Sequence, residues 1–217
     1  MAQLYPHDIS NLDSRYDAEK KVFEYLKGLD NSYHVFHSVA WSADRDGECD
    51  FIVLHELKGL VCLEVKGGRV EYDGGVWTSR DGRGEVHRIK DPVRQAKSAL
   101  YAVRSVWEKR YGEDLPGNYG WGVCFLDGAW DRAYRTMELD EHNVLDASGL
   151  ERVGEWFEEL FGVTERRHGK SLLSTAQSGR LRSLFRGEIR VPLSIQRAIM
   201  LQEEYLREAD RFQDYLL

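Results

Sequence analysis

Three charged side chains interrupt two apolar segments near the middle of the chain. Asp50 lies in the segment CDFIVL, and Glu64 and Lys66 lie near the end of GLVCLEVKGG. Placing charged groups among apolar strand residues costs free energy unless the charges are paired or bound to a metal. Two carboxylates, with the backbone carbonyl of Val65 as a further oxygen ligand, would suit Mg²⁺ or Mn²⁺. The same triplet is also compatible with an ordinary salt bridge on a strand, and the residue types alone do not decide.

A divalent cation at this position would have a clear use in phosphate chemistry. It would lower the pKa of a bound water and stabilise negative charge on a phosphate. Lys66 would orient that water or take its proton. Gly67 and Gly68 follow directly and, having no side chains, would let a phosphate backbone approach closely.

Two predicted strands carry these residues. Segments 49–54 and 59–65 are rich in β-branched residues and are joined by a polar turn, which predicts an antiparallel hairpin. Alternate strand residues share a face, so Glu64 and Lys66 point the same way and Asp50 comes approximately across from Glu64. The pattern predicts further strands at 33–41, 69–73, 76–79 and 120–126.

Helices are predicted on both sides of this block of strands. Residues 17–29 have apolar residues at helical spacing, with Ser14 and Asp17 as candidate caps. A long helix begins at Asp91-Pro92 and runs to about residue 110, and we expect its first-turn backbone N–H groups to favour an anion such as phosphate. Another helix covers 150–161, with Ser148 as its expected cap, and two more cover 171–186 and 194–216.

The order of elements predicts the α/β class, with a central mixed β-sheet flanked by helices and a helical C-terminal extension. We expect a main domain at 1–163 and the extension at 164–217, either as a linker to a following domain or as a surface for self-association. The last helix has an apolar stripe that needs something to pack on.

Composition indicates an ordinary globular protein. Hydrophobic residues make up 42% of the 217 residues and charged residues 31%. No apolar run approaches the roughly 20 residues that span a bilayer, and the N-terminus lacks the pattern of a signal peptide. Cys49, Cys62 and Cys124 are an odd number without a C-x-x-C pair, which favours buried thiols in a reducing compartment. We therefore expect a cytoplasmic protein without a membrane partner.

The formal net charge of −7 disfavours a nucleic-acid partner when taken alone, but the charges are unevenly distributed. Residues 56–110 hold twelve Lys or Arg against eight Asp or Glu, and residues 164–197 hold eight against two. Two basic segments on an acidic body are compatible with local phosphate binding. They are equally compatible with uneven solvation.

Four sequence blocks together resemble the nuclease-related domain (NERD) family, a branch of the PD-(D/E)xK nuclease superfamily. They occur in the order and at the spacing of the family, and the resemblance covers roughly residues 15–130. The blocks are Ala18-Glu19-x-x-Val22-x-x-x-Leu26, Gly47-Glu48-Cys49-Asp50-Phe51-Ile52-Val53-Leu54, Leu63-Glu64-Val65-Lys66-Gly67-Gly68 and Asp91-Pro92-x-x-Gln95-Ala96.

The resemblance implies a role for each of five side chains and a restriction-endonuclease-like fold. Asp50 and Glu64 would bind the metal, Lys66 would act on the water, and Gln95 would orient the water or a phosphate. Glu19 would assist metal binding or hold the lysine. Without the resemblance, Gln95 reads as a solvent-side polar residue at a helix start, and Glu19 as a surface glutamate.

Other chemistries find less support in the sequence. The seven histidines show no zinc-like spacing, and His34 and His37 are expected on opposite faces of one strand. The chain has no phosphate-binding loop of the G-x-x-x-x-G-K-[ST] type.

We therefore expect a Mg²⁺- or Mn²⁺-dependent deoxyribonuclease that hydrolyses phosphodiester bonds in DNA processing, repair or defence against foreign DNA. The end of the chain inside a helical pattern suggests the N-terminal portion of a nuclease–helicase, since NERD domains are often fused ahead of a helicase. Two alternatives stay open. One is a catalytically silent nucleic-acid-binding module, and the other is a scaffold that self-associates through its C-terminal helices.

Overall fold

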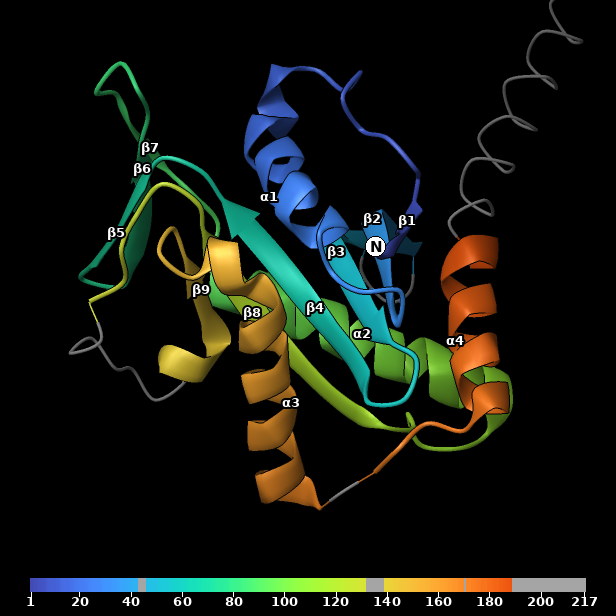
Figure 1. The fold of residues 1–217 in the computed structure, drawn as a ribbon. Helices are drawn as coiled ribbons and strands as arrows, with labels where there is room; N and C mark the ends of the chain where they lie inside the picture. Colours follow the sequence, from blue (N-terminus) through green and yellow to red (C-terminus); the bar gives the residue numbers. More distant parts are fainter. Residues whose placement is uncertain (43–45, 132–138, 170, 189–217) are drawn as a thin grey trace, which may run out of the picture.

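The structure, a computed structural model, describes residues 1–42, 46–131, 139–169 and 171–188. Six strands form a mixed central sheet in the order β1-β2-β3-β4-β8-β9 (Figure 1). Their bounds are Gln3–Tyr5 (β1), Tyr33–Ser42 (β2), Asp46–His55 (β3), Gly59–Lys66 (β4), Asn118–Phe125 (β8) and Val144–Asp146 (β9).

The centre of this sheet combines an antiparallel meander with a parallel crossover. Strands β2, β3 and β4 are successive antiparallel neighbours, whereas β8 joins β4 in parallel. Helix α2 (Pro92–Tyr111) lies on the connection between them. In the parallel register Glu64 is paired with Val123 and Lys66 with Phe125, so the carboxyl ends of β4 and β8 lie side by side.

Helices cover both faces of the sheet. Helices α1 (Asp17–Lys27) and α3 (Val153–His168) pack on one face, where Phe23 and Phe157 join Phe51 in a single apolar cluster. Helices α2 and α4 (Thr175–Glu188) pack on the other, where Trp107 and Phe185 join a cluster formed by the opposite strand side chains. Strand β4 lies between the two layers and is buried from Gly59 to Val65.

A second, smaller sheet stands off the main body (Figure 1). It is antiparallel and contains β5 (Arg69–Asp73), β6 (Val76–Arg80) and β7 (Val86–Arg88). Trp77 joins it to the main sheet, because its ring stacks on Phe125 with centroids 6.1 Å apart. Three 3-10 turns complete the described elements, at Ser14–Tyr16, Glu141–Asn143 and Leu150–Arg152.

The predicted α/β class with a central mixed sheet is confirmed, as are the strands predicted at 33–41, 49–54, 59–65, 69–73, 76–79 and 120–126. The long helix also begins as predicted. Asp91 caps it by accepting the backbone N–H of Arg94 at 3.0 Å, and Gly112 ends it in the left-handed conformation with φ 68°. The helix predicted at 194–216 lies outside the described residues.

The caps predicted for two helices are wrong. Before α1 the chain forms a 3-10 turn that Asp13 caps by accepting the N–H of Arg15, so neither Ser14 nor Asp17 caps the helix. Near α3, Asp146 accepts the N–H groups of Ser148 and Gly149, and Ser148 itself donates to Asp146. In both places an aspartate that precedes the expected serine accepts backbone N–H groups of the turn.

The described part of the C-terminal region, 164–169 and 171–188, packs on the same body as the rest. Helix α3 runs without a break from 153 to 168, across the predicted division between 163 and 164. Leu181 and Leu184 of α4 lie in the same apolar cluster as Ile52 of β3. Among the helices that the structure describes, none is long and apolar enough to cross a bilayer.

Candidate active site

The predicted hairpin brings Asp50 and Glu64 to one end of the sheet. The Phe51–Leu63 pair is the last in the β3–β4 ladder, and Asp50 and Glu64 are the next residues outward. The Asp50 carboxylate accepts the backbone N–H of Val65 at 2.6 Å, and Lys66 Nζ lies 2.5 Å from Glu64 Oε1. Two carboxylates and one ammonium are therefore held together, as the sequence predicts.

An irregularity in β2 lies opposite Asp50. The register passes from His37–Phe51 to Val39–Cys49 and omits the pair Ser38–Asp50. Ser38 has a left-handed backbone with φ 54°, which is uncommon for a residue other than glycine. Phe51 packs in the cluster under α1, but Cys49 packs in the cluster under α2. The strands thus change faces around Asp50, and a local break of this kind redirects a side chain.

Glu19 reaches the same place from α1. Its Oε2 lies 2.6 Å from Nε2 of His37, whose side chain is almost fully buried. The Glu19 carboxylate is close enough to Asp50 and Glu64 to raise the pKa of both. Glu19 is therefore a member of the cluster and not a solvated surface residue. Sequence reasoning missed His37, although a polar residue on the buried face of an aromatic strand was a signal.

Gln95 lies in the first turn of α2. Ala99, one turn later on the same flank of the helix, packs with Cys49 and Cys62 of β3 and β4. This places Gln95 on the side of α2 that faces the hairpin. Its Oε1 atom is buried and has no hydrogen-bond partner among the described residues. Among the described residues no hydrogen bond therefore joins Gln95 Oε1 to Asp50, Glu64, Lys66 or Glu19.

The start of α2 does not offer the free N–H groups that we expected for an anion. The N–H of Arg94 donates to the Asp91 carboxylate, and that of Gln95 donates to the Asp91 carbonyl at 3.1 Å. Pro92 has no N–H at all. Asp91 thus occupies these donors and adds a negative charge, which disfavours a phosphate at this helix start, and the phosphate stays a prediction.

The carboxylates of the cluster repel one another, and they lie where burial limits their hydration. Burial raises the pKa of Asp50 well above its usual range, and the charges of Glu64 and Glu19 raise it further. Burial also raises the pKa of Glu64, which Lys66 opposes by its charge and its hydrogen bond. The Glu64 side chain is only 1% exposed, and its Oε2 atom is buried without a partner among the described residues. One ammonium does not balance this group of acids.

Such a donor set fits a hard divalent cation. A cation between Asp50 and Glu64 would give Oε2 of Glu64 a partner and offset the repulsion that raises both pKa values. The backbone N–H of Val65 already holds the Asp50 carboxylate. The part assigned to the Val65 carbonyl stays a prediction.

A second group of potential ligands lies elsewhere. Atoms of Asp81, Glu85 and His87 come within 4.8 Å of one another around the turn between β6 and β7. His87 Nε2 is 3.6 Å from the Asp81 carboxylate and 3.9 Å from that of Glu85. These ion pairs between exposed side chains account for the grouping.

The glycines after Lys66 serve the fold itself. A Cβ on Gly68, which has φ 76°, would lie 2.5 Å from Ser79 Oγ and 2.7 Å from the Arg80 carbonyl. A Cβ on Gly67 would lie 3.0 Å from Cβ of Ala18 in α1. Close packing of the chain on itself therefore explains both glycines, and our interpretation of them as room for a phosphate backbone is not needed.

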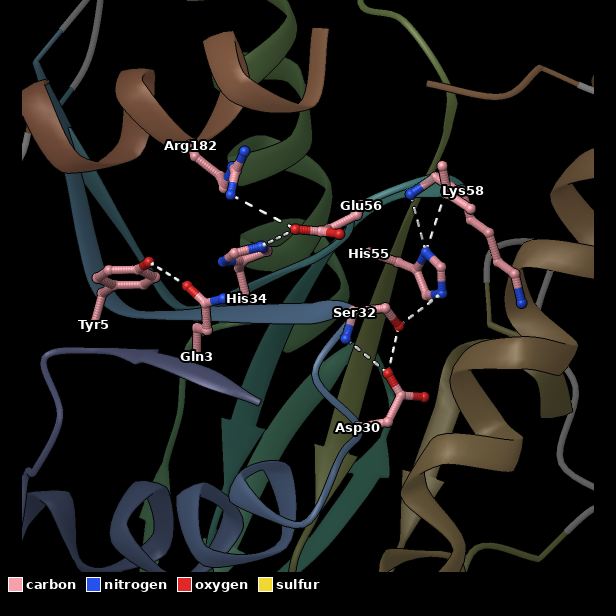
Figure 2. A network of polar contacts seen from close by, with 10 residues as sticks. Gln3, Tyr5, Asp30, Ser32, His34, His55, Glu56, Lys58 and Arg182 are labelled. Carbon is pink, nitrogen blue, oxygen red and sulfur yellow. Dashed lines mark hydrogen bonds and ion pairs between the residues drawn. The ribbon is translucent and has the colours of Figure 1, made fainter. Parts of the chain in front are cut away.

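A serine, a histidine and an aspartate also meet at the opposite end of the hairpin (Figure 2). Nδ1 of His55 accepts the backbone N–H groups of Leu57 and Lys58, at 3.1 and 3.3 Å, so Nε2 must carry the proton of the neutral ring. That proton points to Ser32 Oγ, 3.1 Å away, and Ser32 donates to Asp30. Because the histidine donates to the serine, it is not placed to remove the serine proton, and this network braces the turn.

Comparison with known protein families supports the resemblance seen in the sequence. A family model described as a nuclease-related domain matches residues 14–125. The match includes all five side chains considered above (Glu19, Asp50, Glu64, Lys66 and Gln95). No curated protein matches the chain.

Proposed function

The chain belongs to the nuclease-related domain family, within the restriction-endonuclease-like superfamily, and from this premise we propose that it is a divalent-metal-dependent nuclease that hydrolyses phosphodiester bonds in DNA. One observation carries the proposal beyond the family. Glu64 is buried beside Asp50 and Lys66, and one of its oxygens lacks a partner among the described residues. Lys66 supplies one positive charge beside the carboxylates of Glu64, Asp50 and Glu19, so a further cation would offset the remaining negative charge.

The proposed ligands are Asp50 and Glu64, with the Val65 carbonyl as a third donor and Mg²⁺ or Mn²⁺ as the cation. Bound there, the cation would supply an activated water and stabilise the charge that develops on the phosphate. The N–H of Val65 fixes the Asp50 carboxylate, and Ser38 leaves the ladder open beside it. His37 fixes Glu19 at the edge of the cluster.

Lys66 is the residue proposed to handle the proton. Glu64 holds its Nζ at 2.5 Å, on the same face of β4 as Glu64 itself. From there the ammonium can orient the attacking water or stabilise a phosphate oxygen. Gln95 would approach from α2 and orient the water or the phosphate through its amide.

A nuclease assay tests the proposal directly. Circular and linear DNA are incubated with the protein in Mg²⁺, in Mn²⁺ and in EDTA. We expect cleavage with either metal and none in EDTA, and loss of at least about a hundredfold in rate for Asp50→Asn and Lys66→Met. The matched control is Glu24→Gln, which removes a charge from the exposed side of α1.

Metal binding gives a second readout that does not depend on turnover. Mn²⁺ should raise the melting temperature of the wild type, because a bound cation stabilises the folded state. Asp50→Asn should lose that increase, and Glu24→Gln should keep it. Cleavage that persists in both Asp50→Asn and Lys66→Met would refute the site assignment. DNA binding without cleavage by the wild type would instead favour the silent binding module.

Two further proposals concern the C-terminal part of the chain. One is association of the nuclease with a helicase, and the other is self-association through the C-terminal helices. Light scattering of the whole chain tests self-association, with a single monomeric mass as the result that excludes it.

A further inference from the structure

A basic groove lies on the other flank of α2 from Gln95. It has a volume of about 280 Å³ and is bounded by α2, the first half of β8 and the last turns of α3. Lys97 and Arg104 reach it from α2, Tyr119 and Trp121 from β8, and Arg167 from α3. Strand β9 pairs with β8 only from Val123 onward, so this half of β8 lies at the edge of the sheet.

The groove is positively charged although the protein is acidic. Lys97, Arg104 and Arg167 line it, and no aspartate or glutamate is among its described lining residues. The chain as a whole carries a formal charge of −7. The charged residues that line this cavity are therefore all positive, in contrast to the negative net charge of the chain.

The two basic segments of the sequence meet at this groove. Lys97 and Arg104 belong to the basic segment 56–110, and Arg167 belongs to the basic segment 164–197. The fold thus collects positive charges that lie more than sixty positions apart in the sequence. Counting charges left open that the basic segments are merely solvated surface. In that case the two segments would have no reason to line the same cavity.

Aromatic rings hold two of the cations in place. Nζ of Lys97 lies 5.1 Å from the ring centre of Trp121, and Cζ of Arg104 lies 5.3 Å from that of Tyr119. Such cation–π contacts restrict long side chains that would otherwise move freely. Arg167 is held by Asp140 at 3.1 Å. A ligand with negative charge would then bind cations that are already ordered.

The spacing of the cations suits a chain of phosphates. Lys97 and Arg104 are seven residues apart on α2, about 10 Å along the helix, which is close to the rise of about three nucleotides in one DNA strand. The groove is also near the candidate active site. Trp121 lies two residues before Val123, the partner of Glu64, so its Cα is roughly 8 Å from that of Glu64.

We propose that the groove between α2, β8 and α3 binds the sugar-phosphate backbone of the nucleic-acid substrate, away from the phosphate that is cleaved. The proposal rests on the proposed function for the identity of its ligand. Lys97 and Arg104 contact phosphates about three nucleotides apart on one strand, and Arg167 lies on α3 at the opposite side of the groove. The contact is independent of sequence, because phosphates are the same at every nucleotide.

The salt dependence of binding tests this assignment. The affinity of the full chain for a fluorescein-labelled 20-nucleotide DNA, single-stranded or duplex, is measured by anisotropy in EDTA at 50 to 300 mM salt. Removing two phosphate contacts in Lys97→Gln/Arg104→Gln should reduce the slope of log affinity against log salt by about 1.4 for single strands or about 1.8 for duplex. Affinity at the lowest salt should fall at least about tenfold.

A matched control removes the same charge elsewhere. Lys109 is on the same helix and Arg83 is in the β6–β7 turn, and both are exposed and outside the groove. The variant Lys109→Gln/Arg83→Gln should keep the wild-type slope within about 0.5. The charge-conserving variant Lys97→Arg/Arg104→Lys should also keep it. If it does, loss of folding does not explain the result for the glutamine pair.

The outcomes distinguish a failure of the groove assignment from a failure of the proposed function. Equal slopes for the groove variant and the control would overturn the groove assignment, whether or not the protein cleaves DNA. A groove-dependent slope in a protein that never cleaves would support the groove and refute the proposed function. Groove-dependent binding of poly-glutamate without binding of DNA would also overturn the assignment, in favour of an acidic protein partner.

Discussion

The pair Glu64–Lys66 gives the sharpest quantitative prediction. The Glu64 side chain is 1% exposed and that of Lys66 is 19% exposed, with Nζ 2.5 Å from Oε1. Replacing Lys66 by methionine keeps the length and apolar stem of the side chain but removes the ammonium. Glu64 would then be a buried carboxylate that has lost its bond to the ammonium, and it would still lie close to the charges of Asp50 and Glu19.

The size of the effect follows from the burial of the carboxylate. Breaking a buried ion pair by removing one partner costs about 3–5 kcal/mol when the remaining charge stays. Glu64 can avoid this cost by taking up a proton, because burial already raises its pKa and the charge of Lys66 no longer opposes the rise. A folded-state pKa above the unfolded value stabilises the protein at low pH, and that stability is lost as the pH rises through the folded-state pKa.

Urea unfolding in EDTA at pH 5 and pH 8 measures this directly. For Lys66→Met we expect a loss of about 1 kcal/mol at pH 5 and about 3–5 kcal/mol at pH 8. The double variant Lys66→Met/Glu64→Gln carries no buried charge at this position and should recover to within about 1 kcal/mol of the wild type at pH 8. A loss that is equal at both pH values, or that Glu64→Gln does not relieve, would refute the burial argument.

Three other changes probe the supporting structure. Gly68→Ala should destabilise the fold by about 1–3 kcal/mol in urea unfolding, because φ is 76° and a Cβ would meet Ser79 Oγ at 2.5 Å. Asp91→Ala should cost about 1 kcal/mol in the same assay by removing the cap on the Arg94 N–H. Burial lowers the pKa of His34, so the unfolded chain takes up the proton first and stability should fall as the pH drops below about 6.5. His34→Gln should make the unfolding free energy less sensitive to pH between 7.5 and 5.5.

Each of these three changes has a control variant and a result that contradicts its expected effect. Gly74→Ala is the control for Gly68, since φ is also positive there but nothing lies within 4 Å of the added Cβ. Equal losses at both positions would show that contact with Ser79 does not matter. Asp91→Asn should retain the cap, and an equal loss for Asn and Ala would contradict the capping argument. An unchanged pH dependence in His34→Gln would exclude that histidine as a cause.

The hairpin was predictable because local patterns determine it. Two β-branched runs joined by a short polar turn pair as a hairpin whose register the turn sets, and this register places Asp50 beside Glu64. The long helix was predictable for a similar reason, since Asp91 and Pro92 mark its start and an apolar stripe gives its length. These signals lie within about twenty consecutive residues.

Features that depend on distant residues were not predictable from one sequence. Nothing local indicates that β8 pairs in parallel with β4, or that Ser38 interrupts the ladder opposite Asp50. The same holds for the hydrogen bond between His37 and Glu19, which joins a helix to a strand eighteen positions away. The hydrogen bonds from the N–H groups of Ser148 and Gly149 to Asp146 likewise depend on a turn whose shape the sequence pattern does not specify.

The three buried thiols allow opening of the sheet to be measured by chemical modification. Cys49, Cys62 and Cys124 lie in β3, β4 and β8 and are fully buried. Burial raises the pKa of Cys49 and Cys124, which disfavours the thiolate that reacts with alkylating reagents. A reagent therefore modifies them only when the strands separate, and the rate of modification reports the equilibrium of that opening. Since Cys49 adjoins Asp50, protection of its thiol by Mn²⁺ or DNA would measure how firmly each ligand closes this end of the sheet.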